Sequence, residues 1–330
     1  MKKYKLNIIF HYLIHFAHLR AMILFSLVFL IIGCQSERPK ASDKMNDVYI
    51  TILGTAQDAG FPHINNPQEF SDLEQERIEK EMVVSLGLVD NEEKKKWLFE
   101  ATPDMPQQLH NLEKNHLKTE ALIDGVFITH AHIGHYTGLM YFGREAMGAN
   151  EIPVYAMPRM KAFLETNGPW SQLVSLKNIA LRPIKADSTL RLSKSVAVTP
   201  FEVPHRDEYS ETVGYRIEGE EKSALFIPDI NKWELWDKSI VEEVGKVDYA
   251  FVDATFFKEG EIPRPMSEVP HPFIQETIKL FEGQPLEIKN KVIFIHYNHS
   301  NPAILKNHRL KDSVMELGFK FAKTGDVYPL

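Results

Sequence analysis

Cysteine is almost absent from this chain: Cys34 is the only one among 330 residues. A single cysteine cannot form an intramolecular disulfide, so the fold does not depend on such cross-links. It also excludes a zinc site built from several thiolates inside the folded domain. Any metal held there must therefore bind through nitrogen and oxygen ligands.

Basic residues are too few for a surface that binds polyanions. The chain has 38 Lys and Arg against 45 Asp and Glu. Four of the basic residues and no acids precede Cys34, so the remaining chain has 34 basic and 45 acidic residues, a net charge of −11. Because nucleic-acid binding depends largely on Lys and Arg neutralising phosphates, we expect no nucleic-acid partner.

The N-terminal segment lacks acids and resembles an export signal. Basic residues between positions 2 and 20 precede the apolar segment 21–32, and Gly33 stands directly before Cys34. A positive region followed by an apolar region is typical of a secretory signal peptide. The residues that end at Cys34 are similar to the lipobox of bacterial lipoproteins. We therefore expect Cys34 to be lipidated after cleavage.

Three regions follow from this interpretation. Residues 1–33 are predicted to be a lipoprotein signal peptide, 34–46 a flexible tether, and 47–330 the folded domain. The protein would then be exported and anchored to a membrane, facing the periplasm or the cell surface. An uncleaved membrane anchor is the alternative, because residues 6–16 are also apolar and extend the hydrophobic stretch.

Three histidines follow an apolar run in the pattern H-x-H-x-x-H. His130, His132 and His135 come directly after residues 123–128, whose composition predicts a buried strand. Alternate residues of a strand share a face, so the first two can point the same way while His135 returns from the next turn. Neutral imidazole is a common ligand of Zn, Fe, Ni and Cu. The spacing therefore predicts a metal site with a position open to water.

Predicted strands and helices alternate along the folded domain. Apolar strands separated by helices indicate a sheet covered by helices, and consecutive strands indicate antiparallel portions. We therefore expect an α/β (α+β) fold with mixed sheets rather than one doubly wound sheet. The predicted strands are 48–53, 82–88, 97–99, 123–129, 154–156, 181–184, 196–203, 212–217, 224–227, 249–252 and 292–296. The predicted helices are 106–117, 137–147, 159–166, 232–244 and 272–281.

Further polar residues lie at the ends of predicted strands in the second half of the chain. Sites on folds of this kind gather at one end of the strands, so these side chains are expected to meet the three histidines. The candidates are His205, Asp229, Asp253, His296 and His299.

These motifs resemble the metallo-β-lactamase superfamily of metal-dependent hydrolases. Within this superfamily, the tracts 155–160 and 167–170 resemble the subgroup of proteins similar to the pyrroloquinoline-quinone biosynthesis protein B. The resemblance covers nearly the whole domain and implies an αββα sandwich, two mixed β-sheets flanked by helices, with a metal site at one edge. It also implies the metal ligands, which are His130, His132, His135, His205, the bridging Asp229 and His296.

The segment 253–256, followed by His271 and Glu276, resembles the part of ribonuclease Z that carries a catalytic histidine. This similarity makes His271 a candidate proton donor, with Glu276 or Asp253 fixing its tautomer. Bound Zn²⁺ lowers the pKa of its water from 15.7 to about 7. We expect Asp229 to orient this nucleophile and His271 to protonate the leaving group of a small-molecule ester, lactone or phosphodiester.

One position departs from the family motif. In the signature H-x-H-x-D-H, the aspartate corresponds to Gly134, and that aspartate belongs to the second metal site where two metals bind. Glycine offers no side-chain ligand. One hypothesis is therefore a single metal, bound by His130, His132, His205 and Asp229.

The other hypothesis is that a carboxylate from elsewhere replaces the missing aspartate. Asp58 is the candidate, because it lies in the loop after the first predicted strand, which borders the site in this family. Simple turn chemistry is the alternative explanation of Asp58. His63 lies in the same loop and is a candidate pocket residue, although a single loop histidine is usually just solvated.

Two other classes of function remain open. Histidine and carboxylate ligands with open positions also suit Fe(II), so an oxidative non-haem iron enzyme related to quinone-cofactor synthesis is one. The second is a non-catalytic lipoprotein that binds a small molecule through a metal-holding pocket. Zn²⁺, as one or two ions, is the expected cofactor, with Fe or Mn as alternatives.

Overall fold

The computed structural model describes residues 47–330. The predicted signal peptide, Cys34 as the predicted lipidation site, and the predicted tether lie outside the described residues. Within residues 47–330, no helix is both long and apolar enough to cross a membrane.

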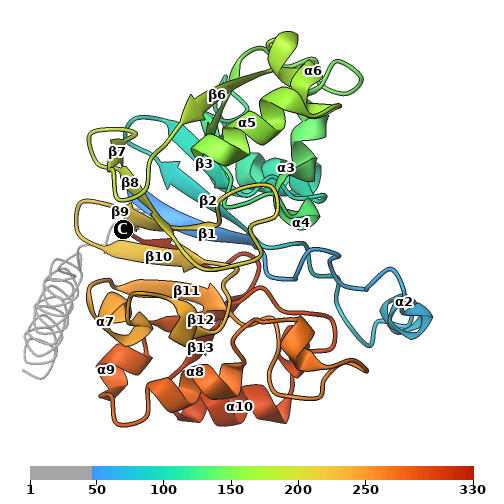
Figure 1. Cartoon of the computed structure of the whole chain (residues 1–330), viewed down its shortest axis with the longest axis vertical. Helices are drawn as coiled ribbons and strands as arrows, with labels where there is room; N and C mark the ends of the chain where they lie inside the picture. The colour runs from blue at the N-terminus through green and yellow to red at the C-terminus, as the bar shows by residue number, and fades with distance from the viewer. Residues whose placement is uncertain (1–46) are drawn as a thin grey trace, which may run out of the picture. The chain divides into compact units, whose positions relative to one another are not determined.

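Two seven-stranded sheets form the centre of the domain (Figure 1). The first sheet has the order β14 (Val327–Pro329), β1 (Val48–Gly54), β2 (Ser85–Asp90), β3 (Lys95–Phe99), β4 (Gly125–Phe127), β5 (Ile152–Ala156) and β6 (Ile179–Pro183). The second has the order β13 (Lys320–Phe321), β12 (Val292–Ile295), β11 (Tyr249–Asp253), β10 (Ser223–Ile227), β9 (Val213–Glu218), β8 (Ala197–Glu202) and β7 (Leu190–Arg191).

Both sheets are mixed. In the first, the strands from β14 to β3 pair antiparallel and those from β3 to β6 pair parallel. In the second, the strands from β7 to β10 pair antiparallel and those from β10 to β13 pair parallel. The prediction of mixed sheets is therefore confirmed.

Side chains that point alternately to the two faces of each strand build a core between the sheets. Ile50 and Ile52 of β1 face Tyr215, Phe226 and other residues of the second sheet, and all are fully buried. Because successive strand residues point to opposite faces, the intervening residues are free to pack against helices. The strands are thus apolar on both faces, as expected for sheets covered on both sides.

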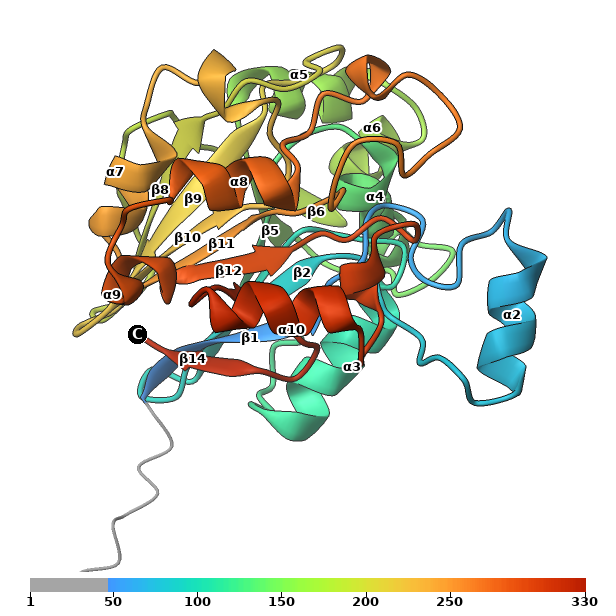
Figure 2. The ribbon, with the colours of Figure 1, turned by 90° about the horizontal axis from the view of Figure 1, so that it is seen from below.

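Helices cover the outer face of each sheet (Figures 1 and 2). The first sheet packs against α3 (Met105–Asn115), η1 (Thr137–Phe142), α5 (Pro158–Thr166) and α6 (Trp170–Ser175). The second packs against η2 (Trp233–Leu235), α7 (Ile240–Gly245), α8 (Ile274–Leu280), η4 (Pro302–Ile304) and α10 (Arg309–Glu316). The short elements α4 (Ile133–Tyr136), α9 (Leu286–Lys289) and η3 (Met266–Glu268) lie in connections. The result is the αββα sandwich that the resemblance implied.

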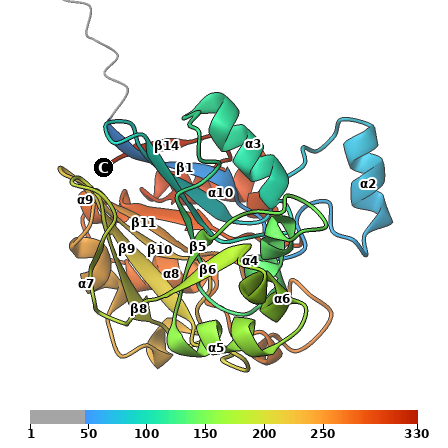
Figure 3. The same cartoon turned by 90° about the horizontal axis from the view of Figure 1, so that it is seen from above.

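Helix α2 (Pro67–Glu74) was not predicted, and none of its residues is buried. It stands away from the sandwich in the connection between β1 and β2 (Figure 3). Asn66 caps it by accepting a hydrogen bond from the backbone N–H of Glu69.

Two predicted helices were wrong in extent. The segment predicted as one helix over 137–147 contains only the 3₁₀ helix η1, and the short α4 precedes the predicted range. A Cβ atom at Gly138 would lie 2.2 Å from the carbonyl oxygen of Thr102, so this turn is pressed against the backbone after β3. The helix predicted over 232–244 divides into η2 and α7, and Ser239 caps α7. Local sequence patterns carry no record of such tertiary contacts.

Candidate metal centre

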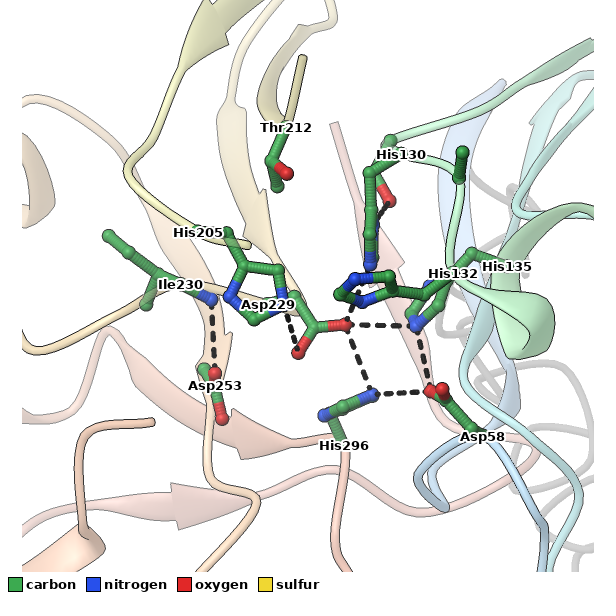
Figure 4. Close-up of polar contacts among 12 residues, drawn as sticks. Asp58, His130, His132, His135, His205, Thr212, Asp229, Ile230, Asp253 and His296 are labelled. Atoms are coloured by element: carbon green, nitrogen blue, oxygen red, sulfur yellow. Dashed lines mark hydrogen bonds and ion pairs between the residues drawn. The ribbon is translucent and has the colours of Figure 1, made fainter. Parts of the chain in front are cut away.

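The predicted site residues lie just beyond the ends of neighbouring strands. His130, His132 and His135 follow β4, and the loop after β8 carries His205. The other three strand ends are those of β10, β11 and β12, which lead to or end at Asp229, Asp253 and His296. Because these ends share one edge of the sandwich, residues far apart in sequence meet there (Figure 4).

Asp229 lies at the centre of the cluster. It is 2% exposed and sits among imidazoles on several sides (Figure 4). Its Oδ2 atom lies 2.9 Å from His135 Nε2 and 3.5 Å from both His130 Nε2 and His296 Nε2. Its Oδ1 atom lies 3.8 Å from His205 Nε2 and 3.4 Å from His271 Nδ1. One carboxylate therefore faces two groups of nitrogen atoms through its two oxygens.

Two sets of candidate ligands share this aspartate. In each set, one ligand atom per residue lies within 4.8 Å of all the others. One set is His130, His132, His205 and Asp229, and the other is Asp58, His135, Asp229 and His296. The structure thus brings together the six residues that the resemblance implied, and adds Asp58.

Several imidazole nitrogens in this cluster are buried without hydrogen-bond partners. Among the described residues, the Nε2 atoms of His130, His205 and His296 and the Oδ1 atom of Asp229 accept or donate no hydrogen bond. Burying a polar atom without a partner is costly. Atoms that converge in this way fit a bound cation, and nitrogen and oxygen ligands of this kind suit Zn²⁺ or Fe²⁺.

The other ring nitrogens of the same histidines are held by hydrogen bonds. His130 Nδ1 lies 2.9 Å from Thr129 Oγ1, and His205 Nδ1 lies 3.2 Å from Asn231 Oδ1. An amide oxygen can only accept, so His205 carries its proton on Nδ1 and presents a lone pair at Nε2. Hydrogen bonds to the non-ligating nitrogen orient metal-binding histidines in this manner.

Thr255 does the same for His296. Its hydroxyl donates to Asp253 Oδ1 at 2.7 Å, so it accepts the proton of His296 Nδ1 at 2.9 Å. The Nε2 atom of His296 is then free to bind a cation. Sequence reasoning did not identify Thr255, although it lies in the block that resembles ribonuclease Z.

Burial and charge set the protonation of the ligands. Burial lowers the pKa of His205 to about 4 and that of His130 well below its ordinary value. Burial alone would raise the pKa of Asp229, but His296, His135 and His205 bring it well below its usual range. Neutral imidazoles and an ionised carboxylate are the forms that bind metals.

His135 occupies the most anionic corner of the cluster. Burial would lower its pKa, but Glu100, Asp58 and Asp229 raise it well above the ordinary value. These carboxylates favour positive charge at this corner, and a metal ion would supply it.

Glu100 was missed by the sequence analysis. It is fully buried, its Oε1 atom lies 3.5 Å from His135 Nδ1, and its backbone has a φ of 76°. A left-handed conformation is unusual for a residue other than glycine and is often found at functional sites. The signal was available, because Glu100 is an acid at the end of an apolar strand, like Asp229.

His271 lies beside the cluster with Asp253 behind it. Its Nδ1 atom is 2.8 Å from Asp253 Oδ2, and Asp253 is itself held by the backbone N–H groups of Ile230 and Thr255. Burial would lower the pKa of His271, but Asp253 raises it above the ordinary value. The imidazole is therefore kept in a form that can give up a proton.

Among the described residues, Glu276 forms neither a hydrogen bond nor an ion pair with His271. Its carboxylate accepts from the backbone N–H of Phe273 at 2.9 Å and from Lys232 Nζ at 2.6 Å. Glu276 thus caps α8, and of the two carboxylates considered, Asp253 is the one that orients His271.

His63 and His299 lie outside the ligand sets. Their rings stack with a centroid separation of 4.2 Å, and His299 Nδ1 lies 2.8 Å from Glu69 Oε1. Neither belongs to a group of candidate metal ligands among residues 47–330. They connect the β1–β2 loop and α2 to the segment after β12.

Known proteins share this fold. The chain is 23% identical over 322 residues to the coenzyme PQQ synthesis protein B of Gluconobacter oxydans, which covers 85% of this chain and 98% of that protein. Zn²⁺-bound PqqB from Methylobacterium extorquens superposes with a TM-score of 0.70 at 20% identity, covering 86% of this chain and 100% of that one. A diphosphatase of the PhnP family gives a TM-score of 0.58 at 21% identity, and the match covers 85% of this chain and 96% of that one.

A family model described as the beta-lactamase superfamily domain matches residues 95–297. This range is more than half of the chain and contains every candidate ligand except Asp58. With its two mixed sheets and its cluster of histidines and aspartates at one edge, the chain belongs to the metallo-β-lactamase superfamily.

Proposed function

We propose that this protein is a metal-dependent hydrolase of a small-molecule substrate. The observation that carries the proposal is the convergence of buried Nε2 atoms without hydrogen-bond partners on the shared carboxylate of Asp229. A similar fold is described as Zn²⁺-bound, which supports zinc as the ion.

A divalent ion held by these ligands would activate a water molecule and polarise the group under attack. Asp229 would help to hold the ion and would orient the attacking water, since this residue belongs to both ligand sets. His271 would protonate the leaving group, with Asp253 stabilising the cationic imidazole at 2.8 Å. His132 is 15% exposed on its side chain and lies towards solvent, where Glu208 contacts it at 3.3 Å, so substrate would enter from its side.

We infer an ester, lactone or phosphodiester as the substrate class. Similar folds include proteins described as a diphosphatase of the PhnP family and human tRNase Z, with TM-scores of 0.58 and 0.52. These descriptions support a phosphorus-centred bond. The similarity to coenzyme PQQ synthesis protein B supports, as the alternative, a role related to quinone-cofactor synthesis, for which Fe(II) at these ligands would supply oxidative chemistry.

The proposal is tested on the purified full-length chain by metal analysis together with turnover. We expect bound zinc and chelator-sensitive hydrolysis of at least one among a phosphodiester, a carboxylic ester and a lactone. Bound iron with oxygen consumption would replace the proposal with the oxidative function. Retained metal without turnover on the panel would favour a binding protein.

We further propose that the protein is exported and lipidated at Cys34. The support is the order of basic, apolar and small residues before this single cysteine. Cells that express the full chain should incorporate labelled fatty acid into it, and Cys34→Ala should remove the label. Equal labelling of the variant would contradict lipidation at this residue.

A further inference from the structure

Gly134 is surrounded at the place where a side chain would begin. A Cβ atom added there would lie 2.5 Å from Asp58 Cα and 2.7 Å from Asp58 Cβ and Cγ. Separations of this size are far below van der Waals contact, and the first involves backbone rather than a movable side-chain end. Residue 134 must therefore be glycine as long as Asp58 stays in its present position.

Asp58 places its carboxylate on the second ligand set. Its Oδ1 atom lies 3.0 Å from His135 Nε2 and 3.6 Å from His296 Nε2 (Figure 4). These two imidazoles, with Asp229, form this set.

The turn that carries Asp58 is tied to the strand end that carries His296. The backbone N–H of Gln57 donates to the carbonyl of Tyr297 at 2.8 Å, and that of Tyr297 donates to the carbonyl of Thr55 at 2.8 Å. The side chain of Asn298 also donates to Gln57. These bonds fix the approach of Asp58 to His296, so the carboxylate is held before any ion binds.

From this geometry we infer that the carboxylate ligand of a second metal site has moved from position 134 to position 58. The second ion is bound by Asp58, His135, Asp229 and His296, and Asp229 is shared with the first. The inference rests on the proposed metal-dependent function and deepens it. It also explains the glycine in the motif, since Asp58 fills the space that a side chain at position 134 needs.

The simplest alternative is that the protein lost its second metal together with the aspartate of the motif. The two hypotheses predict different metal contents for variants of Gly134. If that alternative held, Gly134→Asp would add a ligand and raise the metal content from one ion to two. If Asp58 is the ligand, Gly134→Ala displaces it without supplying a carboxylate and lowers the content from two ions to one. Under the alternative, Gly134→Ala leaves the single ion in place, so this substitution separates the two hypotheses.

The experiment measures bound metal per chain and the affinity for Zn²⁺ on the full-length protein, by elemental analysis and calorimetric titration. The parent should hold two ions. Asp58→Asn, which keeps the size of the side chain, should retain about one ion, with the second bound at least about 100-fold more weakly. Gly134→Ala should also lose the second ion, although it removes no ligand.

Matched controls separate these effects from general damage. No atom lies within 4 Å of a Cβ added at Gly245, so Gly245→Ala should keep both ions. Asp72→Asn, on α2, removes a carboxylate outside every ligand set and should also keep both. Circular dichroism identifies a variant that does not fold; Asp58→Asn still decides the matter if the glycine variants fail.

Either of two results overturns the inference: a parent that binds one ion, or Asp58→Asn that keeps two. The outcome is independent of turnover. The parent could hydrolyse nothing on the substrate panel while Asp58→Asn still loses the second ion. That result would support Asp58 as the relocated ligand and reject the proposed hydrolase.

Discussion

Replacing Asp229 by alanine should remove metal from both ligand sets and reduce turnover by more than about 1,000-fold. The carboxylate faces His130, His135 and His296 through one oxygen and His205 through the other. Asp229 is the one residue that belongs to both of these sets, so its loss removes an anionic ligand from each. Without the ion, the activated water is lost, because the pKa of the attacking water returns from about 7 towards 15.7.

The measurement combines elemental analysis of the purified variant with turnover on the best substrate of the panel. Asp229→Asn is the matched substitution that keeps the volume but removes the charge, and it should show nearly the same loss. Asp237→Asn alters an exposed aspartate eight positions later and should change neither quantity. Full metal content with full turnover in Asp229→Ala would show that this residue has no part in the chemistry.

Substituting His271 by asparagine should lower kcat by about 100- to 10,000-fold while the metal content stays unchanged. This imidazole lies 3.4 Å from Asp229 and is oriented by Asp253, but it belongs to neither shared ligand set. The loss should be smaller for a substrate with a good leaving group such as p-nitrophenolate, because such a group leaves without protonation.

The pH profile gives an independent readout for His271. Its pKa is raised above 6.5, mainly by Asp253 acting against burial. The cationic form, which can donate a proton, is therefore populated below this raised pKa and is lost as the pH increases through it. The parent should lose turnover on this basic side, and His271→Asn should lack that limb.

His110→Asn, on an exposed position of α3, is the control and should keep the parental kcat and profile. Loss of metal in His271→Asn would assign His271 a different role. Asp229, Asp253 and His271 also form a compact group of possible ligand atoms, and such a loss would mean that they hold an ion.

The chemistry of the site could be read from residue types at strand ends. Val292–Ile295 is fully buried on both faces, so its apolar run locates β12 and places His296 directly after it. The same reasoning places Asp229 after β10. It did not extend to Glu100, although this acid directly follows β3 and lies beside His135 in the structure. It also predicted too long a helix over 137–147, because the tight contact at Gly138 has no local signal.

The sequence by itself determined the kind of site: N- and O-ligands without thiolates, and a histidine cluster after a buried strand of a mixed sheet. These follow from composition and from the pattern of apolar residues, which are local properties. The two-sheet sandwich was implied by the resemblance to a known family. Asp58 was a candidate from its place in the loop after the first strand, but only the tertiary structure shows its carboxylate beside His135 and His296. Asp58 and His135 are 77 positions apart, and their contact depends on how closely two backbone segments approach, which no local pattern records.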